Sequence, residues 1–311
     1  MDALTSDPSR RAHLVERTKL EAFAQRDRQA GAPPAAVSKA TSSAVKSDRG
    51  EVPSPPFWGP RTLSDIDVRA LWPCFDLRSL FRLSWGAANT KGEAYERLLR
   101  EDFEPRLKRY QAVALRNGLL KPRVAYGYFP AAGLGNDVIV YDPADLSREI
   151  ARFEFPRQAG GEHLSLADYL REPEGGRASD VIALQVVTVG TQASQRTEAL
   201  QGTGDYGDSY FLHGFSVQAA EALAEYTHRR IRKELGLGEE RGKRYSWGYG
   251  ACPDLAQHDV VFRLLDASER IGVTLTEAFQ MVPEQSTAAI VMHHPRATYF
   301  NAAAQRELAP S

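Results

Sequence analysis

The sequence predicts an α+β fold, and three observations support this class. Four apolar segments have the pattern of strands, and two longer segments have the spacing of amphipathic helices. These elements follow one another in an irregular order instead of alternating regularly as strand, helix, strand. No glycine-rich turn joins a strand to a helix, which argues against a Rossmann-type nucleotide site.

The predicted strands lie in the middle of the chain. Residues 123–133 and 137–143 alternate or run apolar, and the break "LGND" between them predicts a hairpin. Residues 149–158 form a third strand. Residues 181–190, "VIALQVVTVG", are apolar on both faces, so we expect this strand at the centre of the sheet.

Helical spacing predicts two main helices. Residues 90–115 carry an apolar stripe made of Tyr95, Leu98, Leu99, Phe103 and Leu107. Residues 216–236 predict a second helix, which ends at a glycine after a basic last turn. Its buried stripe is Ala220, Leu223, Ala224 and Ile231. Later in the chain we expect a helix, a short element and a strand, at residues 259–272, 276–283 and 286–294.

We divide the chain into a linker-like tail, residues 1–52, and one folded domain, residues 53–311. Within the tail, a charged stretch at residues 13–29 could form a surface helix.

The composition limits the function classes. The net charge of -1 gives no overall positive electrostatic potential that would attract nucleic acid or anionic lipid. No apolar run reaches the roughly 20 residues of a membrane span. Cys74 and Cys252 are far apart, which fits a reducing cytoplasm.

Familiar catalytic motifs are missing from the sequence. It has no P-loop, no HExxH and no nucleophile elbow. His293 and His294 are adjacent at the end of a predicted strand, where neighbours point to opposite faces. We therefore expect one histidine inside and one exposed, and no metal site.

The run "KRYSWGYGACPD", residues 243–254, has an unusual composition for a turn. Arg244 offers a fork for a carboxylate, Gly248 and Gly250 let the backbone approach a ligand, and the aromatic rings can stack on a purine. Together, these three features fit a ligand that is a small zwitterion and carries a flat heterocycle. The plainer alternative is a buried structural loop with Arg244 paired to an acidic side chain and the tyrosines in the core.

Two other segments are candidates for the same site. Tyr299 and Phe300 follow a turn at Pro295, where the sheet ends and loops gather. A terminal edge contact is the alternative explanation for this aromatic pair. Asp76 either caps a helix or accepts a hydrogen bond from a ligand ammonium group.

Together, these segments and several others resemble the C-terminal activation domain of cobalamin-dependent methionine synthase. The shared motifs run in the same order from about residue 52 to about residue 302. They are "VPSPPFWGPR", "YGYFP", "RFEFPRQ", "LADYL", "VVTVG", "AEALAEYTHRRIRKELG", "RYSWGYGACPD" and "GVTLTEAFQMVPEQSTAAIVMHHPRATYFN". Each motif is weak alone, but the ordered set over one domain is specific.

The resemblance implies a fold and a role. The fold is a twisted antiparallel sheet with flanking helices that binds S-adenosylmethionine without a Rossmann motif. The role is repair of a cobalamin that has oxidised to inactive cob(II)alamin. A flavodoxin-type electron donor reduces it while S-adenosylmethionine supplies a methyl group.

The resemblance also implies which residues contact the ligand. Arg244 matches the arginine that binds the carboxylate of S-adenosylmethionine, and Asp76 matches an aspartate near its amine. Glu221, on the long helix, matches a glutamate that faces the site.

The remaining ligand contacts come from two loops. Ser246 and Gly248 match positions that contact the ligand through the backbone, and Tyr249 matches a tyrosine between ligand and corrin. Tyr299 and Phe300 match the aromatic pair beside the ligand. Two positions depart from the family: many members have proline at the place of Gly250 and a smaller or different residue at that of Trp247. We expect a looser loop and an altered pocket shape.

The sequence also lacks features of the other methionine synthase modules. It has neither the Asp-x-His-x-x-Gly pattern of the cobalamin module nor a cysteine cluster for the zinc that activates homocysteine. We therefore expect a stand-alone activation subunit whose cobalamin is bound by a separate methionine synthase core chain. The alternatives are a non-catalytic S-adenosylmethionine-binding module, a conformational clamp, and service to a different corrinoid methyltransferase.

Overall fold

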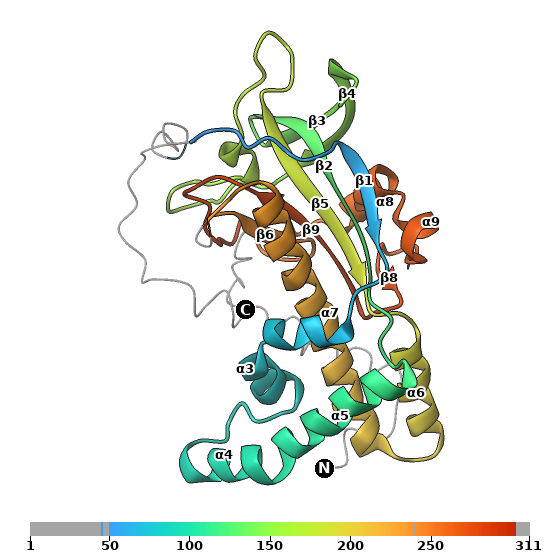
Figure 1. The fold of residues 1–311 in the computed structure, drawn as a ribbon. Coiled ribbons are helices and arrows are strands. Elements are labelled where there is room, and N and C mark those ends of the chain that lie inside the picture. Colours follow the sequence, from blue (N-terminus) through green and yellow to red (C-terminus); the bar gives the residue numbers. More distant parts are fainter. Residues whose placement is uncertain (1–44, 46–49, 239–240, 303–311) are drawn as a thin grey trace.

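The computed structural model describes Val45, residues 50–238 and residues 241–302. Its main element is an antiparallel sheet in the order β4-β3-β2-β5-β9-β6, with β1 paired to β2 (Figure 1). The strands of this sheet are β1 (Gly59–Leu63), β2 (Arg123–Leu134), β3 (Asp137–Asp142), β4 (Asp145–Glu154), β5 (Asp180–Thr188), β6 (Lys243–Ser246) and β9 (Ser286–Met292). A separate small hairpin consists of β7 (Thr274–Leu275) and β8 (Met281–Val282).

Helices lie on both faces of the sheet. The longer ones are α4 (Gly92–Leu98), α5 (Glu104–Asn117), α6 (Gln192–Gly202), α7 (Tyr206–Glu234) and α8 (His258–Leu265). Shorter ones are α3 (Leu77–Ser79), α9 (Ala267–Ile271), η2 (Val68–Cys74), η3 (Leu80–Ser84), η4 (Leu99–Phe103), η5 (Leu166–Tyr169) and η6 (Leu255–Gln257). The predicted α+β class with an antiparallel sheet and flanking helices is therefore confirmed.

The centre of the sheet is β5, as its apolar sequence predicts. All nine of its residues are buried, and it pairs with β2 on one side and β9 on the other. The predicted hairpin at residues 123–143 is also confirmed, because β2 and β3 pair from Leu134 and Asp137 outward.

The helix α7 crosses one face of the sheet and carries part of the candidate site (Figure 1). The predicted apolar stripe of this helix is buried. Gly236, which we expected to end the helix, follows its last turn with a φ of 65°. The helix starts at Tyr206, ten residues before the predicted Ser216, because Asp205 accepts a hydrogen bond from the Asp208 backbone N–H at 3.1 Å and caps it there.

Two apolar clusters fill the two sides of the sheet. One joins α7 and α5 to side chains such as Tyr126, Ala183 and Val291. The other joins α8 and α9 to side chains such as Phe129, Leu184 and Ile290. Neighbouring residues of one strand therefore belong to different clusters, as strand alternation requires.

Three elements do not follow from the sequence patterns. The strand β1 contains a glycine and a proline, and its pairing with β2 is a long-range contact. The helix α6 has a polar sequence with only a weak apolar stripe. The strand β6 takes the first four residues of the run that we expected to be a loop.

The expectation for the two adjacent histidines is wrong, since both are buried. The strand β9 ends at Met292, so the alternation of a strand does not apply to them. His293 Nε2 lies 2.5 Å from Asp180 Oδ1, and His294 Nε2 lies 3.0 Å from the carbonyl oxygen of Val45.

The start of the described chain is held against the domain by side chains. Val45 is buried, Arg171 donates to the carbonyl oxygen of Gly50 at 2.7 Å, and Arg241 donates to that of Glu51 at 3.0 Å. The surface helix predicted at residues 13–29 lies outside the described residues, and the division at residue 52 stays a prediction. Within the described ranges, no helix is both long and apolar enough to cross a membrane.

Candidate functional site

The candidate site lies along β6, the outermost strand in the order of the sheet. This strand pairs with β9, where Arg244 is opposite Val291 and Tyr245 is opposite Ile290. Val291 belongs to the cluster beside α7 and Ile290 to the opposite cluster. Arg244 therefore faces α7, while Tyr245 faces away from it.

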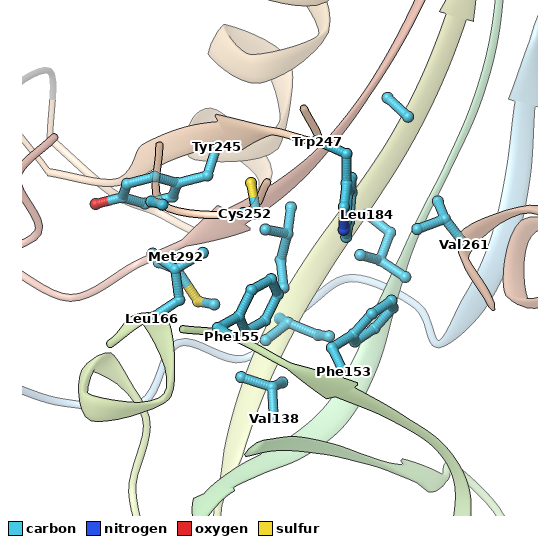
Figure 2. Packing of buried hydrophobic residues seen from close by; sticks show 14 of the residues in the cluster. Val138, Phe153, Phe155, Leu166, Leu184, Tyr245, Trp247, Cys252, Val261 and Met292 are labelled. Atoms are coloured by element: carbon cyan, nitrogen blue, oxygen red, sulfur yellow. The ribbon is translucent and has the colours of Figure 1, made fainter. Parts of the chain in front are cut away.

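The face away from α7 is a packed core. Tyr245 and Trp247 are both buried and point into a cluster with Met292 and Phe153 (Figure 2). Trp247 also donates from Nε1 to Gln257 Oε1 at 3.1 Å. For Tyr245 the plainer alternative, a tyrosine in the core, is therefore correct, whereas Tyr249 is only partly buried.

The face toward α7 carries an ion pair between two of the predicted site residues. Arg244 Nη2 lies 3.2 Å from Glu221 Oε2, and the two side chains are 14% and 15% exposed. The other terminal nitrogen of Arg244, Nη1, is buried and has no hydrogen-bond partner among the described residues. A guanidinium can donate five hydrogen bonds in a planar fork, so this one retains the capacity to bind a carboxylate.

Two further side chains of α7 flank this pair and were not predicted from the sequence. Glu225 accepts hydrogen bonds from Arg229 at 2.9 Å and from His228 at 3.4 Å. Burial opposes the ionisation of Glu225, but the hydrogen bonds from His228 and Arg229 and the charge of Arg244 outweigh it and lower its pKa to about 2. The spacing of Glu221, Glu225 and His228, four and three residues apart, places them on one helix face and is a signal that the sequence contains.

Burial also lowers the pKa of His228 and outweighs the opposing hydrogen bond from Glu225. A neutral imidazole that donates from Nδ1 to a carboxylate leaves Nε2 as an acceptor. Nε2 of His228 is buried and has no partner in the described part of the chain.

The depressed pKa of Glu225 predicts a pH-dependent contribution to stability. The carboxylate stabilises the folded state fully above its ordinary pKa of 4.5, and this contribution is lost as the pH falls toward about 2. We expect Glu225→Gln to lower the free energy of unfolding at pH 7, with a difference from wild type that shrinks between pH 4.5 and 2. Urea unfolding at a series of pH values measures this difference, and a constant difference would contradict the assignment.

The turn after β6 brings backbone close to its neighbours. Gly248 has a φ of 87°, and its N–H donates to the carbonyl oxygen of Cys252 at 2.9 Å. The N–H of Cys252 donates to the carbonyl oxygen of Tyr249 at 2.8 Å, which closes the turn. Glycine is required at position 248 because its φ lies in the left-handed region.

Gly250 joins this turn to the second predicted loop. Its carbonyl oxygen accepts from the N–H of Ala302 at 2.8 Å, and a Cβ at this position would lie 2.9 Å from the Cα of Asn301. The glycine therefore permits a close backbone approach, which is a different role from the loosening that we expected from the loss of the family's proline.

We predict that Gly250→Ala displaces the segment around Asn301 and costs about 1–3 kcal/mol of stability, as overpacking does. Chemical unfolding measures the cost. The matched control is Gly202→Ala, because a Cβ there meets nothing within 4 Å. Equal effects of the two substitutions would show that the approach of Asn301 does not constrain position 250.

The aromatic pair divides between surface and core. Tyr299 is 51% exposed, while Phe300 is buried and packs near Tyr169 and Tyr245. Tyr245 donates from its hydroxyl to the carbonyl oxygen of Thr298 at 2.6 Å. This hydrogen bond holds the residue that directly precedes the aromatic pair. The structure thus brings the second loop to the same end of β6 as the turn, with the ring of Tyr299 at the surface.

Asp76 lies at the start of α3, between η2 and η3, which both contact α7. Its Oδ1 accepts from the N–H of Ser79 at 3.0 Å and its Oδ2 accepts from the hydroxyl of Ser79 at 2.7 Å. Of the two roles open from the sequence, the structure thus shows the helix cap. The adjacent Phe75 packs on Phe215 of α7 with ring centroids 5.6 Å apart.

The side chains of the candidate site are suited to hold a small charged ligand. Burial raises the pKa of the Cys252 thiol, which donates to the carbonyl oxygen of Ser246 and is therefore a poor nucleophile. Among the described residues, no group of three or more His, Cys, Asp or Glu side chains could hold a metal ion. An arginine fork, carboxylates and closely approached backbone suit a small ligand with a carboxylate.

Fold and site together define an α+β domain whose candidate ligand site lies at the outermost strand of an antiparallel sheet. Residues 64–307 match the family model of the activation domain of vitamin B12 dependent methionine synthase. The chain belongs to this family, and the resemblance seen in the sequence is confirmed.

Curated relatives support the same family. The chain is 40% identical to the methionine synthase of Mycobacterium tuberculosis and 39% identical to that of Mycobacterium leprae, each over 278 residues. Both alignments cover 81% of this chain and 23% of the relative. The chain thus spans about a quarter of the length of these relatives.

A solved structure has the same fold. It is the crystal structure of the MetH reactivation domain bound to AdoHcy, with a TM-score of 0.72 and 24% sequence identity. The similarity covers 88% of this chain and 90% of that one.

Proposed function

We propose that this chain binds S-adenosylmethionine at the β6 edge as a methyl donor for the reactivation of a cobalamin-dependent methionine synthase. The observation that carries the proposal is the Arg244 guanidinium, which lies beside Glu221 and keeps a buried nitrogen without a partner in the described structure. The MetH reactivation domain, which shares the fold, is bound to AdoHcy in its crystal structure.

In this proposal Arg244 binds the ligand carboxylate, and the acids Asp76 and Glu221 lie near its ammonium group. Backbone at Ser246 and Gly248 supports the body of the ligand. The side chains that remain are Tyr249, Tyr299 and Phe300, which flank the ligand, and the exposed ring of Tyr299 suits a surface that a corrin covers.

The cobalamin would be bound by a methionine synthase core chain, and a flavodoxin-type protein would supply the electron. When bound to the partner, a reduced cobalamin would supply the nucleophile that takes the methyl group from the sulfonium, with S-adenosylhomocysteine as the product left on this chain. This chain would therefore hold and orient the donor without a nucleophile of its own. We place this reaction in the cytoplasm, where the free thiols Cys74 and Cys252 stay reduced.

A second candidate function is a non-catalytic one, either an S-adenosylmethionine-binding module or a clamp for a corrinoid methyltransferase. It is favoured by the same binding chemistry, because neither candidate requires a protein nucleophile. The two candidates differ in whether methylcobalamin forms.

A reactivation assay tests the proposal. The chain is mixed with a methionine synthase core chain in the cob(II)alamin state, a flavodoxin-type reductant and S-adenosylmethionine, and absorbance follows the formation of methylcobalamin. We expect methylcobalamin to form with the wild-type chain and not with Arg244→Ala. Binding of S-adenosylmethionine without any methylcobalamin would favour the non-catalytic candidate.

A further inference from the structure

His294 is a buried side chain that connects two distant parts of the chain. Its Nδ1 accepts a hydrogen bond from the backbone N–H of Arg296 at 3.0 Å. Its Nε2 lies 3.0 Å from the carbonyl oxygen of Val45, which is 249 positions away in the sequence. In a neutral ring, an Nδ1 that accepts carries no proton, so Nε2 carries it and donates to Val45. One hydrogen bond of His294 is therefore local, and the other reaches the start of the described chain.

On the local side, His294 begins the loop that carries the aromatic pair, residues 293–301, here called the aromatic loop. The N–H of Thr298 donates to the hydroxyl of Tyr169 at 3.2 Å, and the N–H of Ala302 donates to the carbonyl oxygen of Gly250 at 2.8 Å. The rings of His294 and Tyr169 lie together, with centroids 5.4 Å apart. Tyr169 thus contacts both the start and the middle of the aromatic loop.

On the distant side, residues near the start of the described chain reach the same loop. Val45 is buried and belongs to the apolar cluster that also contains Phe300. Arg241 donates to the carbonyl oxygen of Glu51 at 3.0 Å and to that of His293 at 2.8 Å. An apolar cluster and two polar side chains therefore join this part of the chain to the aromatic loop.

The order of the loop and the docking of Val45 depend on each other. If Val45 leaves its place, the Nε2–H of His294 stays buried without its acceptor, which is costly. The cost falls when His294 moves toward water, and the aromatic loop begins at this residue. Because such linkage is reciprocal, a displaced loop also weakens the docking of Val45.

We propose that His294 is a positioning residue that makes the order of the aromatic loop depend on the docking of Val45. The consequence for a ligand rests on the proposed function, in which Tyr299 and Phe300 flank S-adenosylmethionine. Release of Val45 then weakens ligand binding, although Val45 itself is not among the residues proposed to bind the ligand. The chain that leads into the domain thus acts on the site through one histidine.

Two substitutions separate the two hydrogen bonds of His294. The amide of asparagine takes the place of Nδ1 and keeps an acceptor for Arg296, while the amide of glutamine takes the place of Nε2 and keeps a donor for Val45. We measure hydrogen exchange of the Thr298 and Ala302 amides in the full chain. We expect about 5- to 100-fold faster exchange in His294→Asn, in line with the loss of a buried hydrogen bond, and a change within about threefold in His294→Gln.

The decisive substitution is Val45→Gln, which puts an amide in the apolar cluster and leaves the aromatic loop itself unchanged. We expect the same two amides to exchange about 5- to 100-fold faster, because the loop opens when Val45 is released. Combined with His294→Asn, it should add no more than about threefold, as expected for two changes that break one contact. The matched control is Leu115→Gln on α5, where the leucine is 50% exposed, and it should not change this exchange.

Unchanged exchange of these amides in Val45→Gln would overturn the inference, because the loop would then open independently of Val45. A larger effect in His294→Gln than in His294→Asn would also overturn it, since the local hydrogen bond would then hold the loop. If His294→Asn does not fold, the comparison of Val45→Gln with Leu115→Gln decides.

Titration of S-adenosylhomocysteine into the same variants tests the consequence for the ligand. We expect a weaker affinity in folded Val45→Gln and wild-type affinity in Leu115→Gln, whereas a loss of stability alone leaves the affinity of the folded chain unchanged. Wild-type affinity in Val45→Gln would overturn the link to the ligand. No binding to the wild-type chain would count against the proposed function, and the hydrogen exchange would still decide whether Val45 and the aromatic loop are coupled.

Discussion

Replacement of Arg244 by alanine is expected to weaken the binding of S-adenosylmethionine by about 100-fold or more. A charge-assisted hydrogen bond contributes about 1.5–3 kcal/mol, and the arginine fork supplies two of them to a carboxylate. The substitution also leaves Glu221, which is 15% exposed, without its cation. Equilibrium dialysis with labelled ligand measures the loss.

The control for this prediction is Arg244→Lys. Lysine retains the positive charge beside Glu221 but lacks the planar fork, so we expect an intermediate affinity, weaker than wild type by about 10-fold. Thermal unfolding of both variants checks that the domain is folded. Wild-type affinity in a folded Arg244→Ala variant would mean that the carboxylate binds elsewhere.

Replacement of His293 by leucine is expected to have the largest effect on stability, about 3–5 kcal/mol. His293 Nε2 lies 2.5 Å from Asp180 Oδ1, and the two side chains are 3% and 1% exposed. Without the histidine, the Asp180 carboxylate stays buried and its hydrogen bonds from the described residues are those of the Arg171 and Val181 backbone N–H groups, at 2.9 and 2.8 Å. Urea unfolding measures the change in the free energy of unfolding.

A second histidine–carboxylate pair provides the control. His213 lies 3.0 Å from Glu284, and this pair is 20% and 49% exposed. Exposed pairs contribute about 0–1 kcal/mol, so His213→Leu should change stability by no more than this. If both substitutions had the same small effect, the buried pair would not be a main support of the end of β9.

Much of the fold could be predicted because local patterns agree with tertiary contacts. The continuous apolar run of β5 requires burial on both faces, and the structure places this strand at the centre of the sheet. The apolar stripe of α7 likewise predicts both the helix and the face that it buries. By contrast, β1 could not be predicted, since five residues with a glycine and a proline become a strand only by pairing with β2.

The candidate site could be predicted in part. Composition alone singled out the run that contains Arg244, but it could not show that β6 presents alternate residues to two different environments. Tyr245 enters the core because β9 places it opposite the apolar Ile290, and this pairing links residues about 45 positions apart. The contact between Gly250 and Asn301 is likewise invisible in the sequence, because it depends on a close approach of two loops.

The residues that match the family's ligand contacts also differ in what the structure shows of them. Arg244 and Glu221 lie in contact, as the residues of one site would, and their part in binding a ligand stays a prediction. Asp76 is a helix cap in the structure, and its proximity to a ligand amine stays a prediction. The helix face that Glu221 shares with Glu225 and His228 was readable from their spacing alone.

The measurement that tests the central claim most directly is a calorimetric titration of S-adenosylmethionine into the full chain, alone and with a cobalamin-bearing methionine synthase core chain. We expect saturable binding of one ligand per chain, absent in Arg244→Ala. No heat of binding to the wild-type chain under either condition would contradict the claim that the β6 edge holds the methyl donor.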